Sequence, residues 1–503
     1  MKDQRVQQPL SNRVEDNVSM LKQKLGNSSD LIVRTLKIGA REGGIVYIDG
    51  ISDTQMISQF IITPLQSFSI AEQDDLHMNI VLDSLQKHIA VSNIKVDTDW
   101  KTVTQEVLSG NTVIFLEDSK QAIIASTKDV EARSVAEPTT QNLIRGPKDC
   151  FTEKIRTNTA LIRTRIASPD LRIDAITVGE VTHTNTAVVY IDGLAKDELV
   201  QDVKKRIEDI SIDGVLESSY IESFIIDKKS AIFPMVLNTE RPDVVAANLL
   251  EGRIAIVVDG TPFVLIAPAT FFQFFQSPED YYQSQYIGSF LRILRIISFF
   301  LSLLIPALYI AVVTQHPAMI PTDLLFSIAA QREGVPFPTI VEALVMEIAF
   351  ELLREGGVRM PKAVGSAATI VGALILGQTA VQAGLVSAAT IIVVASTAIS
   401  SFAIPYYNMA ITARLLRFLL MIGAAYMGMY SIILILLMLG VYMCNLHIFN
   451  MPYLAPLAPF IPGDQKDTFV RLSWSHLTKR PLPASSKNKR RISQKSGESD
   501  ETE

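Results

Sequence analysis

The chain has 503 residues, of which 19% are charged, and a formal net charge of −6. This acidic balance argues against a nucleic-acid-binding protein, which would usually carry a basic patch on a basic domain. The two cysteines, Cys150 and Cys444, lie far apart without a repeated spacing, which excludes a disulfide framework or a cysteine metal site as the organising principle. The length allows several domains, and residues 363–413 contain no Asp, Glu, Lys or Arg.

A charged αβ region follows a polar leader, residues 1–29. In DLIVRTLKIG, residues 30–39, Ile32, Leu36 and Ile38 share one parity, which predicts a strand with one buried face. GIVYIDG, residues 44–50, predicts a buried strand that ends in an Asp-Gly turn. A helix is expected from near Ser52 to Pro64. NTVIFLED and SKQAIIAST, joined at Asp118-Ser119, predict a hairpin.

The αβ region repeats itself. VYIDG at 46–50 recurs at 189–193, an offset of 143 residues. LSGNTVIFLEDSKQAII, which begins at Leu108, is echoed by LEGRIAIVVDGTPFVLI, which begins at Leu250, an offset of 142 residues. Two agreeing offsets predict two similar αβ subdomains, 30–135 and 168–286. Two unrelated strand–turn–helix units are the alternative.

A connecting helical segment, 136–167, joins the two subdomains. It contains a turn at Arg145-Gly146-Pro147 and then a helix whose arginines, Arg156, Arg163 and Arg165, we expect to face outward. Arg145, Arg163 and Arg165 are candidate contacts for an anion or an acidic neighbouring subunit. A solvated helix face is the simpler explanation of such a row.

The remainder predicts a helical membrane domain, 287–460, and a disordered polar tail, 461–503. At least four crossings are expected, near 296–313, 364–384, 386–404 and 419–444. Arg292 and Arg295 flank the first crossing, and cations on that flank favour a cytosolic αβ region. The expected fold class is therefore an α+β soluble N-terminal region of two similar αβ subdomains, followed by an α-helical multi-pass membrane domain.

An apolar helix with acids inside it is expected at 338–355. Its carboxylates are Glu342, Glu347, Glu351 and Glu355, and the last three share one face. Three arrangements remain open. In the first, the helix lies at the membrane interface with its acids in headgroup water. In the second, its acids pair with basic groups such as Arg414 or Arg417. In the third, the helix lines a pore whose carboxylates favour cations.

The uncharged stretch after this helix also carries candidate residues. Gln378 and Gln382 are polar at membrane depth and should face protein or water rather than lipid. Together with the acids they form the candidate pore or gating set, Glu342, Glu347, Glu351, Gln378 and Gln382. Small residues allow close helix contacts, and the candidates for such packing are Gly365, Gly372, Gly377 and Gly384.

Catalytic chemistry is not indicated. The six histidines are scattered without ligand spacing, and the sequence contains no phosphate loop, nucleophile elbow or HExxH motif. We therefore expect no enzyme, no catalytic residues, no cofactor and no metal.

Several stretches resemble the A subunits of GerA-type spore germinant receptors. They are EPTTQNLIRGPKDCFTEKIRTNTALIRTRI, PFPTIVEALVMEIAFELLREGGVRMP, VGALILGQTAVQAGLVS and PYLAPLAPF, and the resemblance extends over about 30–460. It implies a multi-pass protein of the spore inner membrane that works with a transporter-like B subunit and a lipoprotein C subunit in answering small nutrients. It also implies a homo-oligomer in the membrane that forms a nutrient-gated cation-release path. The rival is a non-conducting scaffold or signalling membrane subunit whose soluble domain binds ligand or partner subunits.

Overall fold

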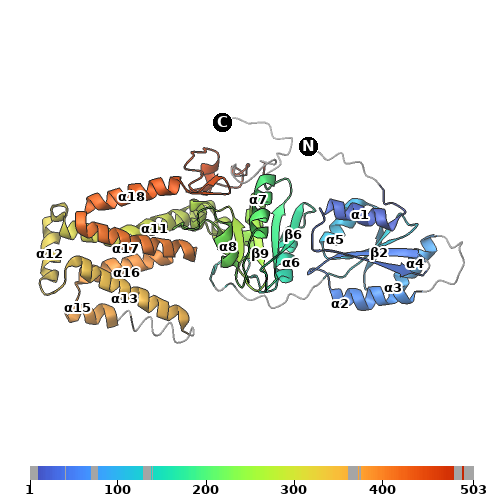
Figure 1. Ribbon diagram of the computed structural model, residues 1–503, viewed down its shortest axis with the longest axis horizontal. Helices are drawn as coiled ribbons and strands as arrows, with labels where there is room; N and C mark the ends of the chain where they lie inside the picture. The colour runs from blue at the N-terminus through green and yellow to red at the C-terminus, as the bar shows by residue number, and fades with distance from the viewer. Residues whose placement is uncertain are drawn as a thin grey trace. The chain divides into compact units, whose positions relative to one another are not determined.

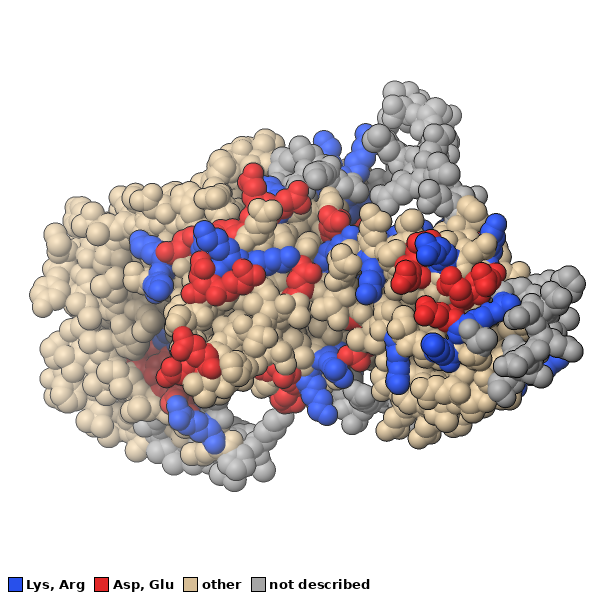
Figure 2. All heavy atoms as spheres, turned by 45° about the vertical axis from the view of Figure 1, so that its right-hand side comes forward, with Lys and Arg blue, Asp and Glu red and all other residues tan. Residues whose placement is uncertain are grey.

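The computed structural model forms two units. It describes residues 9–39, 41–68, 78–128, 138, 140–360, 372, 375–480 and 490–491. The αβ unit comprises the chain up to Lys229, Val236–Ala269 and the chain from Leu477, and the helical unit comprises Ser230–Met235 and Thr270–His476. On the face drawn in Figure 2, charged side chains gather over the αβ unit and much of the helical unit is uncharged.

The first half of the αβ unit is an antiparallel sheet between two helical layers (Figure 1). Its elements are α1 (Val14–Lys24), β1 (Leu31–Ile38), β2 (Arg41–Ile48), α2 (Thr54–Met56), a π-helix (Ile57–Ile62), α3 (Thr63–Ser67), α4 (Met78–His88), β3 (Ile94–Asp97), α5 (Trp100–Leu108), β4 (Thr112–Leu116) and β5 (Ala122–Ala125). The strand order is β1-β2-β4-β5-β3. Side chains alternate across a strand, so Val46 packs with α1 and α5 on one face and Ile45 with the π-helix, α3 and α4 on the other.

The second half has the same design. Its elements are α6 (Ile155–Arg165), β6 (Leu171–Val178), β7 (Thr184–Ile191), α7 (Asp197–Glu208), α8 (Ser218–Ile225), β8 (Leu237–Thr239), α9 (Pro242–Leu250), β9 (Ile254–Val258) and β10 (Val264–Ala267). The strand order, β6-β7-β9-β10-β8, matches that of the first sheet position by position. The sequence repeat thus corresponds to two sheets of one topology.

The expected polar leader, residues 1–29, contains a packed helix, because α1 buries Val14 and Leu21 against the first sheet. One expectation for the first half is wrong. The helix expected to stop at Pro64 continues past it, because Pro64 stands in the first turn of α3, where proline is tolerated. A π-helical turn at Ile57–Ile62 connects α2 to α3 and buries Ile57 and Ile61.

The helical unit contains the acidic helix and the apolar helices. Its elements are a 3₁₀ turn (Phe271–Phe275), α10 (Glu279–Tyr282), α11 (Gln285–Thr314), a 3₁₀ turn (Pro317–Met319), α12 (Thr322–Arg332), α13 (Thr339–Arg359), a π-helix (Ile375–Thr379), α15 (Ala380–Gln382), α16 (Ala388–Phe402), α17 (Tyr407–Met427), α18 (Met429–Cys444), β11 (His447–Ile448), β12 (Met451–Pro452) and a 3₁₀ turn (Asp464–Asp467). An αβ N-terminal region followed by a helical part agrees with the expected class.

Two of the helices in the described part of the chain, α11 and α17, are long and apolar enough to cross a membrane. The expected crossing at 296–313 lies within α11, and that at 386–404 corresponds to the shorter α16. Most of the expected crossing at 364–384 lies outside the described residues. A single crossing at 419–444 is wrong, because Gly428, with φ 59° and ψ −132°, separates α17 from α18. This backbone region is open essentially to glycine alone, so the helix ends there.

The expected disordered tail is also wrong for its first part. Residues 461–480 are described, and Arg471 is buried within the helical unit. Asp467 accepts a hydrogen bond from the Tyr281 hydroxyl at 2.8 Å and lies 2.9 Å from Nη1 of Arg292. The chain after the last apolar helix therefore returns to the beginning of α11.

Candidate functional site

Helix α13 carries the four carboxylates of the acidic segment, and they differ in exposure. The helix begins after Pro338, which has extended backbone angles, and its sequence is rich in strong helix formers such as Ala, Leu, Glu and Met. Glu342 and Glu347 are 1% and 0% exposed. The Glu351 side chain is 24% exposed and that of Glu355 is 58% exposed. The two buried carboxylates need compensation inside the protein.

Glu347 and Glu351 form ion pairs with arginines in the middle of α17. Nη2 of Arg417 lies 3.1 Å from Oε2 of Glu347 and 3.2 Å from Oε1 of Glu351. Nη1 of Arg414 lies 2.9 Å from Oε2 of Glu351. Spacings of four residues on α13 and three on α17 place these side chains on facing helix surfaces. Of the three arrangements that the sequence left open, the structure has the paired one.

Arg354 adds a third cation. Its Nη1 lies 3.5 Å from Oε1 of Glu351, and its Nη2 donates a hydrogen bond of 2.9 Å to Oγ of Ser401 on α16. Its guanidinium lies 5.0 Å from the ring centres of both Phe350 and Phe402, which is cation–π distance. We call the resulting group of five charged side chains the charge cluster: Glu347, Glu351, Arg354, Arg414 and Arg417. It connects α13, α16 and α17.

The charges of the cluster depend on one another because several of them are buried. Removing one partner of a buried ion pair typically costs about 3–5 kcal/mol, because the other charge is left uncompensated. Within the described residues neither carboxylate oxygen of Glu347 accepts a hydrogen bond, so Arg417 stabilises it by charge alone. Separating α13 from α17 would therefore require water or another cation to reach Glu347.

Glu342 has a different role at the beginning of α13. Its Oε1 accepts a hydrogen bond from the backbone N–H of Ser387, the residue that caps α16. Oγ1 of Thr390 lies 3.2 Å from the Tyr309 hydroxyl of α11. Nε of Arg332 lies 3.8 Å from Oε2 of Glu342. Glu342 thus joins the beginnings of α13 and α16 rather than the charge cluster.

The structure does not bring the two glutamines to the charge cluster. Gln378 lies in the π-helix and Gln382 at the end of α15, and both are exposed. In the uncharged stretch, a methyl group at Gly372 would overlap Leu353 of α13, which indicates close approach to that helix. A methyl group at Gly377 would lie 3.9 Å from Ile391, so this glycine is less confined. Gly384 has a positive φ of +64°. Gly365 lies outside the described residues.

The expectation that Arg163 faces outward is wrong. Its side chain is 1% exposed and its Nη2 lies 2.9 Å from Oδ2 of Asp30. The same nitrogen donates to Oγ of Ser28, and Nη1 donates to the carbonyls of Ser168 and Leu171. Helix α6 lies against both halves of the αβ unit, and Arg163 joins them through this buried pair.

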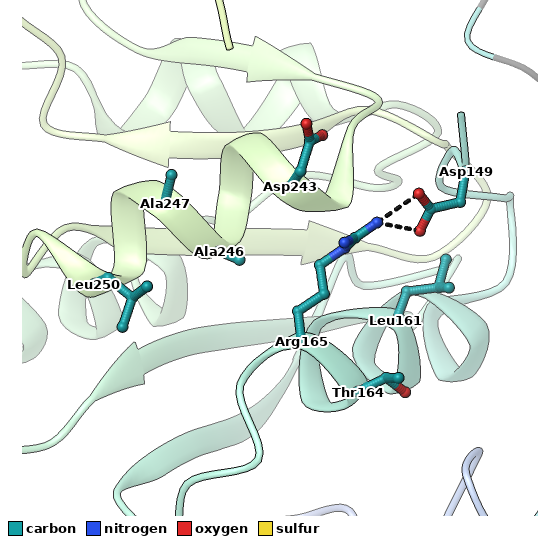
Figure 3. Close-up of a pocket in the computed structure, with 8 residues that line it drawn as sticks. All are labelled: Asp149, Leu161, Thr164, Arg165, Asp243, Ala246, Ala247 and Leu250. Carbon is teal, nitrogen blue, oxygen red and sulfur yellow. Dashed lines mark hydrogen bonds and ion pairs between the residues drawn. The ribbon is translucent and has the colours of Figure 1, made fainter. Parts of the chain in front are cut away.

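Arg165 and Arg145 have different surroundings. Arg165 forms a two-pronged contact with Asp149 at the side of an open cavity of about 540 Å³ between α6 and α9 (Figure 3). Its floor is apolar and includes Leu161 and Leu250. Because Asp149 occupies the guanidinium, an external anion would have to displace it. Arg145 lies on an exposed loop.

A second buried ion network was not anticipated. Arg292 and Asp280 are both 0% exposed, with Nε of Arg292 3.2 Å from Oδ2 of Asp280. Arg295 contacts the other oxygen of Asp280 at 2.6 Å. From the sequence, Arg292 and Arg295 are expected only to flank a membrane helix. Asp280, close before them in the sequence, could have indicated an ion pair with these arginines. Asp467 lies far along the chain, so no local pattern indicates its contact with Arg292.

The fold and the charge cluster define a class of protein: a doubled αβ unit followed by a helical unit that has two helices long and apolar enough to cross a membrane and that contains buried ion pairs. The chain belongs to a family described as Bacillus/Clostridium GerA spore germination protein, whose model matches residues 19–482.

Individual relatives cover nearly the whole chain. Spore germination protein KA of Bacillus subtilis (strain 168) is 47% identical over 483 residues, which cover 95% of this chain and 88% of that protein. Spore germination protein GerLA of Bacillus cereus is 37% identical and covers 92% of this chain and 93% of its own length. The crystal structure of the N-terminal domain of the A subunit of the Bacillus megaterium spore germinant receptor GerK3 covers 53% of this chain and 99% of its own, with 38% identity and a TM-score of 0.43.

Proposed function

We propose that this chain is the A subunit of a spore germinant receptor. The observation that carries the proposal is the family match across residues 19–482. The chain would act in the spore inner membrane as a multi-pass protein with its αβ unit in the cytosol. It would form a homo-oligomer and work with a transporter-like B subunit and a lipoprotein C subunit. The complex would answer a small nutrient and trigger germination.

The charge cluster supplies the gate in this proposal. In the closed state Arg414 and Arg417 neutralise Glu351 and Glu347. Nutrient occupancy of the receptor would favour a second arrangement in which α13 moves away from α17, which requires that the nutrient bind the two states with different free energies. The released carboxylates would then face water along a shared path and favour the passage of monovalent cations.

Neutralising the two acids tests this gate. Glu347→Gln with Glu351→Gln removes the carboxylates that would favour cations in the open path, so nutrient-triggered cation release should fall and germination should slow. Glu355→Gln is the matched control, because Glu355 is exposed and pairs with Arg359 on its own helix. Germination is followed by loss of optical density and cation release by flame photometry. Unchanged germination and release by an equally abundant double variant would contradict the gate.

A non-conducting scaffold or signalling subunit is the second candidate. One observation favours it: both carboxylates of the charge cluster are already neutralised by arginines of the same chain. In that case the cluster only holds the helices together, and another subunit moves the ions. Reconstituting the purified full chain in liposomes separates the two, since a path made of this chain alone gives cation flux and a scaffold gives none.

A further inference from the structure

Residues 230–235 are part of the helical unit, although the chain on both sides of them belongs to the αβ unit. They lie between the end of α8 and the beginning of β8. A connection between a helix and a strand of one unit usually runs over the surface of that unit. Here it is built into the neighbouring unit instead. We call residues 230–235 the relay segment.

The backbone of one residue in the relay segment bridges two helices. The N–H of Ile232 donates a hydrogen bond of 3.1 Å to the Tyr442 hydroxyl of α18. Its carbonyl accepts one of 2.9 Å from Oγ1 of Thr412 on α17. The same oxygen of Thr412 lies 3.1 Å from the carbonyl of Asn408, so the hydroxyl proton is shared between the relay segment and α17 itself. Side chains of the helical unit thus satisfy both backbone groups of Ile232.

An aromatic side chain anchors the relay segment. Phe233 is 3% exposed. Its ring centre lies 6.2 Å from that of Phe271, 6.4 Å from that of Tyr442 and 6.1 Å from that of Tyr453. Aromatic pairs at such distances are stabilised beyond the burial of their area. The relay segment is therefore held in the helical unit by packing as well as by hydrogen bonds.

The relay segment is attached tightly to β8 and loosely to α8. Met235, Val236 and Leu237 are 1%, 0% and 1% exposed, so the chain is packed without a break from the relay segment into β8. Residues 227–230, on the side of α8, are exposed. A displacement of β8 would reach the relay segment directly, whereas the exposed residues could absorb a displacement of α8.

Strand β8 is also attached to the chain that joins the two halves of the αβ unit. Oγ1 of Thr239 donates a hydrogen bond of 2.7 Å to Oε1 of Gln141. Oε1 of Glu240, directly after β8, accepts one of 2.6 Å from the backbone N–H of Thr140. Glu240 is 2% exposed, and a buried charged group bonded in this way fixes the backbone it contacts. A rearrangement of the two halves would therefore act on β8.

Helix α17 contacts the relay segment on one face and the charge cluster on another. At about 100° per residue, Arg414 lies about 200° and Arg417 about 140° around the helix from Thr412. These two arginines pair with Glu351 and Glu347 of α13. A push or pull on Thr412 would therefore reach the charge cluster through a single helix.

We propose that the relay segment transmits a rearrangement of the αβ unit through β8 to α17, and so to the charge cluster. The relay rests on the gate of the proposed function, because it acts on the contact between α13 and α17. It assigns the mechanical input of that gate to six residues. Coupling of this kind is carried by packed segments that have two discrete arrangements.

The relay is tested by cutting the two hydrogen bonds of Ile232. Thr412→Val with Tyr442→Phe removes both and keeps the shape of the two side chains. The matched control is Thr397→Val with Tyr430→Phe, because the Thr397 hydroxyl bonds a carbonyl of its own helix and Tyr430 is a 72% exposed residue of α18. Thr412→Ser alone retains both hydroxyl groups and should behave as the unaltered chain.

Hydrogen exchange first establishes that the attachment has been cut. It is measured by mass spectrometry on the purified full chain in detergent. In the double variant, the peptide that contains Ile232 should exchange roughly tenfold faster, because two hydrogen bonds have been lost. An unchanged exchange rate would overturn the attachment and, with it, the relay.

Germination is then measured in spores whose only germinant receptor contains this chain. The probe is a complete broth of amino acids, sugars and nucleosides. The rate of optical-density loss is divided by the amount of chain in the membrane, because a merely destabilising change lowers the amount and not the rate per molecule. The double variant should lower the rate per molecule roughly tenfold, and the control and Thr412→Ser should leave it unchanged.

An insertion tests the route through β8. Two glycines between Lys229 and Ser230 lengthen the exposed connection to α8 and leave β8 attached, so the rate per molecule should not change. An equal loss from this insertion would overturn the route through β8. Faster exchange of Ile232 with a normal rate per molecule would overturn the relay.

The same spores separate failure of the relay from failure of the proposed function. A normal rate in the Thr412 and Tyr442 double variant, with a reduced rate in Glu347→Gln with Glu351→Gln, would overturn the relay alone. A normal rate in the glutamine variant would overturn the gate. An unaltered chain that gives no response to the broth would overturn the proposed function itself.

Discussion

Arg417 is the residue whose loss should cost the helical unit most. Arg417→Met replaces the arginine by an unbranched apolar side chain of similar length. Glu347, which is 0% exposed, then stays buried without its ion-pair partner. Losing one partner of a buried pair costs about 3–5 kcal/mol. The double variant Arg417→Met with Glu347→Met removes both buried charges, and apolar replacement of a buried pair is often neutral or stabilising. It should therefore recover most of the lost stability.

The measurement is equilibrium unfolding of the full chain in detergent, followed by circular dichroism. Arg359→Met is the control, because Arg359 pairs with Glu355 on the exposed end of α13, with side chains 79% and 58% exposed. Exposed pairs contribute about 0–1 kcal/mol. The reasoning is refuted if Arg417→Met lowers the free energy of unfolding no more than Arg359→Met does. It is also refuted if the double variant is as unstable as the two single changes added together.

Two further predictions concern the αβ unit. Burial, and then the charge of Glu240, raise the pKa of the Cys150 thiol to about 12, so the thiol stays protonated at pH 8. Iodoacetamide should modify Cys150 after unfolding but not before, and rapid modification of the folded chain, read by peptide mass spectrometry, would contradict this. Arg163→Met leaves Asp30 as an uncompensated buried charge and should lower the stability of the αβ unit by about 3–5 kcal/mol. Limited proteolysis should then cut between its halves, and resistance equal to that of the unaltered chain would count against a joining role.

The αβ unit was largely predictable because its signals are local. Alternating apolar residues before an Asp-Gly turn specify β2 and β7, and the repeat offset aligns the two sheets. The helix within the polar leader was not predicted, because α1 is short and mostly polar. Its few apolar residues are buried only because the first sheet offers them a face.

The helical unit was less predictable because its decisive contacts are between residues far apart in the sequence. The spacing of Glu347 and Glu351 placed them on one face but could not choose among water, a pore and arginine partners. Only the packing of α13 on α17 makes that choice. Gly428 stands in an apolar run where a glycine is equally compatible with a continuous membrane helix, so no local signal predicts that α17 ends there.

The charge cluster also constrains the order in which the chain can be assembled. Arg414 and Arg417 follow Glu351 by 63 and 66 residues, so a ribosome delivers the acids well before their partners. A buried charge without its partner costs about 3–5 kcal/mol, so Glu347 is not stably buried against this face before Arg417 has been made. Helix α13 therefore takes up its packed position only after α17 has been synthesised, and the α13–α17 contact is a late step in the folding of the helical unit.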